Sequence, residues 1–435
     1  MPSDRSLFRS APGRAAVGLS ALASSALSTA CTDKATGTGT GSATASASAV
    51  AYVDTALAFE DTVFYYRSRV NFPAQQSAVR DSLARTRSQG PGRDTLYYRP
   101  VDYSINPFLR DAGDEHSDFF RPSEAPGASD ASPTDPRFQV SGYLLPASAG
   151  VTTGNPVGYV WYPPYTGTTP VGHIDSTVAV IRTLDQSSPC GYVLDLRFNY
   201  GGSIFPMMAG LAPLFGNAPA SSTLRGVGGW VDYTQATTVI FLQNGAVGAA
   251  DASTGYSELV YAATSPYTLK RANTPVAVLI DSLTASAGEF ITLGFRGGPV
   301  PVRVFGEPSY GVTTTPYYHD FADGAFLNIT AGVMMDRTGQ LYGGKLTPDQ
   351  YVVGTNFRSL LPSQAATTPD AVVTAAVAWL NTQPSCGGTS TAASAPSFSR
   401  DVTGTAPALK PGRGVQRVSR YWSSRGARAM VGARR

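Results

Sequence analysis

The sequence predicts an α/β fold for most of this 435-residue chain, from two observations. Short apolar segments rich in Val, Ile, Leu and Tyr recur from residue 138 onward, and segments with helical periodicity lie between them. Strands that alternate with helices indicate a sheet with helices packed on its faces. Only 14% of the residues are charged and the net charge is +3, so the body of the protein lacks the basic excess expected of a nucleic-acid binder.

Each expected element rests on its own local pattern. The expected strands read VGYVWY, GYVLDLRF, TPVAVLID, VPVRVFGE and FLNITAGV, and the expected helices cover residues 174–185, 203–214, 286–296 and 370–381. Upstream, apolar residues recur at three- and four-residue spacing between 52 and 88, and the sequence QGPG follows as a helix stop. We therefore expect a small N-terminal helical subdomain over 52–125 and an α/β core over 126–387.

The two ends of the chain differ from this body. Residues 1–31 place three arginines before a short apolar run and then small residues and Cys31, which is the order of a bacterial export signal. Cys31 is a lipidation site if this is a cell-envelope lipoprotein held at the membrane surface; plain secretion and a cytosolic location stay open. Residues 32–51 lack large apolar groups and read as a flexible linker, and 388–435 read as a disordered basic tail.

Three cysteines and three histidines leave few ligands for a metal site, and no metal or cofactor is expected. With Cys31 assigned to the anchor, Cys190 and Cys386 could form a disulfide in an oxidising compartment, or remain two buried thiols.

A serine stands where an apolar strand runs into a helix, in the segment PVAVLIDSLTASAGE. At such a junction Ser286 could act as a nucleophile, because the helix N-terminus offers free N–H groups to a developing oxyanion. The alternative is that Ser286 or Thr284 only caps the helix, with Glu289 completing a capping box.

Two glycines follow another apolar strand in CGYVLDLRFNYGGSIFP. Gly201 and Gly202 would let the backbone approach a ligand closely and direct N–H groups toward it. The spacing matches neither the dinucleotide fingerprint nor a phosphate-binding loop.

Taken together, LDLRFNYGG, PVAVLID-LTASAGE, VFGEPSYGVTT and YGGKLTPD occur in the order typical of one family. The chain resembles the C-terminal processing, or tail-specific, serine peptidases from about residue 52 to 380. The resemblance implies a core of the tail-specific protease/crotonase-like type and a serine peptidase with Ser286 as nucleophile. It also implies an oxyanion hole made by the N–H groups of Ala287 and of Gly201 or Gly202.

The base cannot be the lysine used by the bacterial tail-processing branch, because Val312 occupies its position in GEPSYGV. The segment GDEHSDF instead resembles the Ser/His branch of the superfamily, which includes the nisin resistance protein and the tricorn protease, and that resemblance implies His116 as general base. His319 is the reserve base, and His173 is expected as a surface histidine.

The third member of the site stays open. Ser117 could orient His116, and Tyr342 stands where the tricorn branch has an acidic residue. Too few residues separate His116 from the first core strand for a PDZ domain, so a cleft between helical unit and core would select a peptide or protein tail. The alternatives are a catalytically inactive ligand- or peptide-binding protein on the same fold, and an envelope adaptor acting through its anchor and tail.

Overall fold

The structure of the protein is a computed structural model that describes residues 45–85, 97–122, 136–167, 169–216, 226–252, 257–354 and 370–389. The expected export signal with Cys31 and the basic tail from residue 390 lie outside these described residues. Within them, no helix is both long and apolar enough to cross a membrane.

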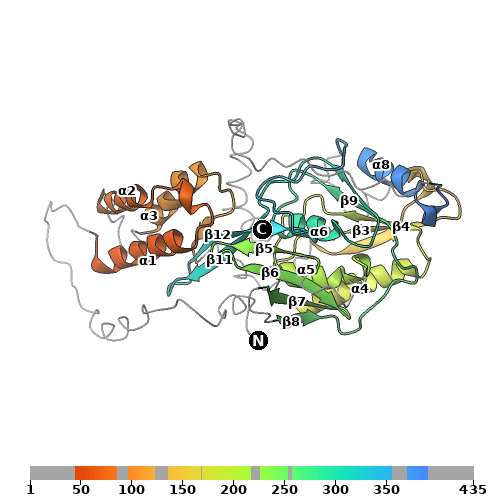
Figure 1. Ribbon diagram of the computed structural model, residues 1–435, viewed down its shortest axis with the longest axis horizontal. Helices are drawn as coiled ribbons and strands as arrows, with labels where there is room; N and C mark the ends of the chain where they lie inside the picture. The colour runs from red at the N-terminus through yellow and green to blue at the C-terminus, as the bar shows by residue number, and fades with distance from the viewer. Residues whose placement is uncertain are drawn as a thin grey trace.

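The strands of the described residues form two sheets (Figure 1). The first contains, in spatial order, β13 (Gln350–Tyr351), β10 (Val302–Gly306), β9 (Val276–Ile280), β4 (Gly191–Asp195), β3 (Val157–Trp161) and β2 (Ser141–Leu144). The second contains β1 (Asp118–Phe120), β12 (Phe326–Met335), β5 (Gly228–Asp232), β6 (Thr237–Gln243), β7 (Ala246–Asp251) and β8 (Ser257–Ala262), with β11 (Thr314–Asp320) beside β12.

The helices occupy two places in the molecule. Three helices and a π-helical turn precede β1: α1 (Ala47–Val63), α2 (Phe72–Arg85), α3 (Tyr98–Tyr103) and the turn Ser104–Leu109. The other helices belong to the core: α4 (Pro170–Asp185), α5 (Ile204–Gly210), α6 (Ala287–Phe295) and α8 (Ala371–Leu380). Figure 1 shows the first group at one end of the molecule and the second around the first sheet.

The first sheet is the α/β core that the sequence predicts. Its strands β13, β10, β9, β4 and β3 run parallel, and β2 joins antiparallel to β3. Helices cover both of its faces: Leu194 and Val278 pack with residues of α4, α5 and α6, whereas Val193 and Ala277 pack with residues of α8. Because both faces are buried, its central strands are continuously apolar rather than alternating.

The second sheet is antiparallel, and its β5–β8 meander was not predicted. Its long strand β12 joins the two parts of the molecule, since the helical unit packs against Leu327, Ile329 and Ala331 of this strand. The helical unit is also not purely helical, because its last element, β1, pairs with β12. Helix α1 begins at Ala47, inside the range 32–51 expected as a linker.

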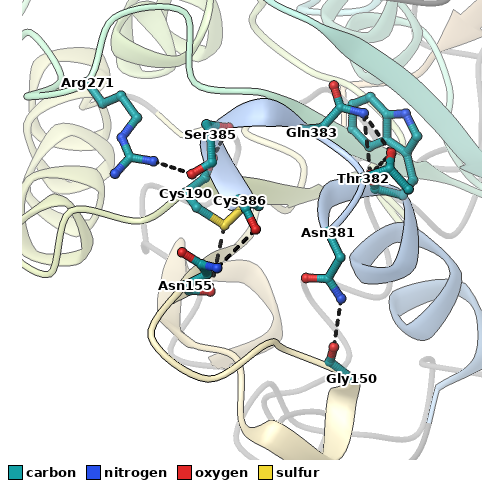
Figure 2. Close-up of a disulfide and its surroundings, with 10 residues drawn as sticks. Gly150, Asn155, Cys190, Arg271, Asn381, Thr382, Gln383, Ser385 and Cys386 are labelled. Carbon is teal, nitrogen blue, oxygen red and sulfur yellow. Dashed lines mark hydrogen bonds between the residues drawn. A yellow bond between two sulfur atoms is a disulfide. The ribbon is translucent and has the colours of Figure 1, made fainter. Parts of the chain in front are cut away.

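A disulfide joins Cys190, directly before β4, to Cys386 in the turn after α8. Both cysteines are buried, and hydrogen bonds from neighbouring residues hold their backbone carbonyls (Figure 2). The Ser385 hydroxyl donates to the Cys190 carbonyl at 2.8 Å, and the Asn155 amide donates to the Cys386 carbonyl at 3.0 Å. The last helix is thereby held against the central strand that leads to the glycine turn.

Candidate functional site

The two segments singled out in the sequence meet at one edge of the parallel sheet. Strands β4 and β9 are neighbours, with Asp195 opposite Leu279 in register. The segments that follow these two strands leave the sheet at its carboxyl edge, where ligands of open α/β sheets bind. The turn after β4 carries Gly201 and Gly202, and the turn after β9 carries Ser286.

Ser286 occupies a strained position at the start of α6. Its φ of 50° and ψ of −115° lie where non-glycine residues are rare, and such residues concentrate at functional sites. It is the N-cap of α6 and forms a capping box with Glu289. The capping role expected as the alternative is therefore present, and it leaves the serine half-buried at the junction of β9 and α6.

The turn before Ser286 is held rigidly. Asp281 accepts hydrogen bonds from the backbone N–H groups of Phe198, Leu283 and Thr284 at 2.9 to 3.1 Å. The Thr284 hydroxyl donates to the Leu196 carbonyl at 2.9 Å, across to the neighbouring turn. These bonds fix the path of the chain from β9 to the helix.

Glycines let the two turns touch. A Cβ at Gly201, whose φ is +104°, would lie 2.9 Å from both the Ala287 nitrogen and the Ser286 Cβ. A Cβ at Gly288 would lie 2.4 Å from the Asn199 carbonyl oxygen, and one at Gly202 would overlap a carbonyl oxygen of the 162–167 loop. The glycine turn thus lies directly against the serine and the first turn of α6.

The backbone N–H groups near Ser286 differ in whether they already donate a hydrogen bond within the protein. The Gly201 N–H donates to the Asn199 side-chain oxygen at 3.0 Å, which corrects the expectation that Gly201 could supply an oxyanion donor. Within the described residues, the N–H groups of Gly202 and Ala287 have no hydrogen-bond acceptor. Ala287 is the first residue of α6, where the N–H is free by the geometry of a helix.

The buried carboxylate of Glu289 is hydrogen-bonded to the backbone of the serine. Glu289 accepts from the Ser309 hydroxyl and the Gly311 N–H through Oε1, and from the N–H groups of Ser286 and Val312 through Oε2. Burial raises the pKa of Glu289 to about 7, and the four donors oppose that rise. From the sequence, Glu289 was interpreted only as a capping residue. The signal available was an acid at the third position of an otherwise apolar helix.

His116 lies at the end of the helical unit, where it contacts β11 and β12. Its backbone N–H donates to Asp114 Oδ1 at 3.0 Å, and its carbonyl accepts from the Asn328 side chain at 2.9 Å. Its ring Nδ1 lies 2.8 Å from the Thr314 hydroxyl at the start of β11. Two residues earlier, Val312 donates to the same Glu289 oxygen as Ser286 does, so segment 312–314 connects the surroundings of the serine to the ring.

The ring is partly buried. Burial lowers the pKa of His116 to about 4, although the Asp114 carboxylate raises it in part. In the described part of the chain, the side chains of Ser286 and His116 are not hydrogen-bonded to each other. Bonds between a nucleophile and its base often tighten only in the substrate complex, so this separation is compatible with a catalytic pair.

Ser117 does not contact the ring as expected. Its buried hydroxyl accepts from the Thr330 N–H of β12 at 2.9 Å. Thr330 also donates its hydroxyl to Asp114 at 2.6 Å. Ser117 and Asp114 therefore fasten the loop of His116 to β12, and Thr314 is the residue that contacts the imidazole.

The other two histidines contact aromatic side chains, and Nε2 of His173 also lies 3.0 Å from the Tyr162 hydroxyl. His173 stacks on Tyr165 with ring centroids 4.0 Å apart and is half-buried, which corrects its expected place on the surface. Its pKa is lowered to about 4 by burial. His319 lies on β11 against the rings of Phe59 and Phe321, at 5.3 and 4.8 Å between centroids. Tyr342, at the expected place of an acid, donates its hydroxyl to a carboxylate oxygen of residue 336.

Behind the glycine turn lies a buried ion-pair network. Arg197 donates to Asp195 through Nε at 2.9 Å and pairs with Asp370 at 2.7 Å. The Tyr159 hydroxyl donates to Asp195 at 2.6 Å, and all four side chains are buried. Burial alone would lower the pKa of Arg197, but the two carboxylates raise it above its usual value. The network joins β4 to the N-terminus of α8.

Among the described residues, no group of three or more His, Cys, Asp or Glu side chains could hold a metal ion.

Comparisons with known proteins agree with the motif order. The model of peptidase family S41 matches residues 157–352. The chain is similar to the nisin-resistance protein of Lactococcus lactis subsp. lactis, with 32% identity over 168 residues that make up 38% of this chain and 48% of that protein. The match thus spans about half the length of that relative.

Solved structures were compared as well. A lipoprotein from Streptococcus agalactiae superposes with a TM-score of 0.49 at 18% identity, covering 73% of this chain and 95% of the other. The photosystem II D1 C-terminal processing protease superposes with a TM-score of 0.42 at 15% identity, covering 71% and 94%. Residues 157–352 of this chain thus match peptidase family S41, and the chain is similar to the nisin-resistance protein.

Proposed function

We propose that this protein is a serine endopeptidase that cleaves peptides or protein tails through an acyl-enzyme on Ser286. The observation that carries the proposal is the strained Ser286 at the strand-to-helix junction, with the free N–H of Ala287 beside it and the glycine turn in contact. A helix cap alone does not require this φ, whereas an exposed nucleophile on a sharp turn does.

The chemistry follows from the groups present. Nε2 of His116 takes the Ser286 hydroxyl proton as Oγ bonds to the peptide carbonyl carbon. The N–H groups of Ala287 and Gly202 stabilise the oxyanion of the tetrahedral intermediate. The imidazolium then gives its proton to the leaving amine as the C–N bond breaks. Water, activated by the same imidazole, hydrolyses the ester and restores Ser286.

The location we propose is outside the cytoplasm, with Cys31 as the lipid anchor. The order of charged, apolar and small residues before Cys31 supports export, and so does the buried disulfide between Cys190 and Cys386, since disulfides persist in oxidising compartments. Mass spectrometry of the N-terminal peptide from cells would test it; an unmodified, uncleaved N-terminus would contradict it.

Labelling with a serine-reactive fluorophosphonate tests the proposed pair. We expect the wild type to be labelled, Ser286→Ala to be unlabelled, and His116→Ala to be labelled about 10²–10⁴-fold more slowly, the usual contribution of a general base. His319→Ala, which changes another half-buried histidine, is the matched control and should react like the wild type. Equal labelling of the wild type and Ser286→Ala would end the proposal.

The pH dependence provides a separate measurement. A base must be unprotonated to accept the serine proton, so activity is lost as pH falls through its pKa. Because burial lowers the pKa of His116 to about 4, we expect the acid limb of kcat/KM for a quenched peptide to be centred near pH 4 rather than near 6.5. The variant His173→Phe, which keeps a ring on Tyr165, should retain this limb. A limb centred near pH 6.5 in the wild type would contradict a buried His116 as base.

A further inference from the structure

The ring of His116 is anchored from a different part of the chain than its backbone. The loop holds the backbone on both sides, through Asp114 on the N–H and Asn328 on the carbonyl. What these bonds leave undetermined is the rotation of the imidazole about its side-chain torsions. The 2.8 Å hydrogen bond between ring Nδ1 and the Thr314 hydroxyl restricts this rotation.

The same contact bears on the tautomer. A neutral imidazole carries one N–H, and the nitrogen that accepts the serine proton must be the other one. The tautomer that serves the proposed chemistry is the one in which Nδ1 donates to the Thr314 hydroxyl, because Nε2 then keeps its lone pair for Ser286. The contact with Thr314 raises the pKa of His116, against the larger effect of burial.

Thr314 is itself well fixed. It is 4% exposed and starts β11, where it lies opposite Val333 of β12. It follows by two residues the N–H of Val312, which Glu289 holds together with the N–H of Ser286. A short, buried piece of backbone therefore relates the position of the ring to that of the serine.

We propose that Thr314 is the positioning residue that orients the imidazole of His116 by accepting a hydrogen bond from Nδ1–H, in the place where a serine peptidase triad carries an acid. This inference rests on the proposed Ser286/His116 chemistry. A hydroxyl can accept a hydrogen bond from Nδ1–H and so stabilise the imidazolium that forms when Ser286 is deprotonated. Unlike a carboxylate, it adds no charge beside the ring.

The test is Thr314→Val, which keeps the shape and strand preference of the residue and removes the hydroxyl. Hydrogen bonds to charged groups are stronger than neutral ones, so we expect kcat to fall about 10- to 100-fold with KM changed less than about twofold. The acid limb of kcat/KM should move to lower pH, because an acceptor that stabilises the imidazolium is lost. Thr314→Ser should restore kcat to near the wild-type value.

Thr313→Val is the matched control. Thr313 is the adjacent, equally buried threonine, and its hydroxyl donates at 2.8 Å to the Gly344 carbonyl instead of to the ring. It should lose stability like Thr314→Val yet keep the wild-type kcat and acid limb. If both variants lower kcat equally, or if Thr314→Val leaves kcat and the limb unchanged, Thr314 has no positioning role.

Failure of this inference is distinguishable from failure of the proposed function. If His116→Ala is inactive while Thr314→Val is fully active, only the role of Thr314 is wrong. If His116→Ala retains wild-type activity, the proposed base is wrong, whatever Thr314→Val does.

Discussion

Replacing Ser286, His116 or both with alanine should lower kcat by about the same factor, on the order of 10⁴-fold. The reason is that the two side chains are proposed to act as one unit: a serine without its base stays protonated, and a base without its serine has no proton to remove. What remains in each variant is the contribution of substrate binding and of the N–H groups of Ala287 and Gly202. The losses should therefore not multiply in the double variant.

Single-turnover cleavage of an internally quenched peptide, with enzyme in excess, measures this without interference from product release. His319→Ala again serves as the control and should stay within about twofold of the wild type. A double variant that is slower than either single variant by the product of their factors would show that the residues act independently. If His319→Ala is inactive and His116→Ala is not, the reserve histidine on β11 is the base.

The sequence was informative where the structure is local. The strand-to-helix junction at Ser286 and the glycines at 201–202 could be predicted because the signal is a few adjacent residues: a buried strand, a small or capping residue and an apolar helix. Those junctions lie together because parallel neighbouring strands end at one edge of the sheet. The parallel core was equally accessible, since strands buried on both faces are continuous apolar runs.

The remaining parts depend on contacts between distant residues. Thr314 lies 198 positions after His116, and no pattern in either segment announces their bond. The loss of Gly201 as an oxyanion donor depends on how the Asn199 side chain folds back, which the pair of glycines does not encode. The β6–β7 hairpin, by contrast, has a local signal that was missed: residues 239–242 are an apolar run, and Asn244-Gly245, both with positive φ, form the two-residue turn that joins the strands.

The buried ion pairs behind the site should dominate stability, and Arg197→Met should lower the free energy of unfolding by about 3–5 kcal/mol. Methionine fills a similar volume but leaves the carboxylates of Asp195 and Asp370 without their cation, 0% and 6% exposed. Asp195 keeps its bonds from the Tyr159 hydroxyl and from the backbone N–H of residue 197, and Asp370 keeps its bond from the N–H of Val372. These neutral donors cannot replace a charge in a medium that excludes water.

Urea unfolding of both proteins at pH 7 measures the difference, and Arg80→Met provides the matched control. Arg80 also pairs with an aspartate at 2.8 Å, but the two side chains are 50% and 42% exposed, so its loss should cost less than about 1 kcal/mol.

Neutralising the two unpaired carboxylates, in Arg197→Met with Asp195→Asn and Asp370→Asn, should recover part of the lost free energy of unfolding. The deficit of Arg197→Met should also shrink as pH falls, because uncompensated buried carboxylates have raised pKa values and take up protons. Equal losses of unfolding free energy in Arg197→Met and Arg80→Met would mean that burial does not make the Arg197 network more stabilising than a surface ion pair.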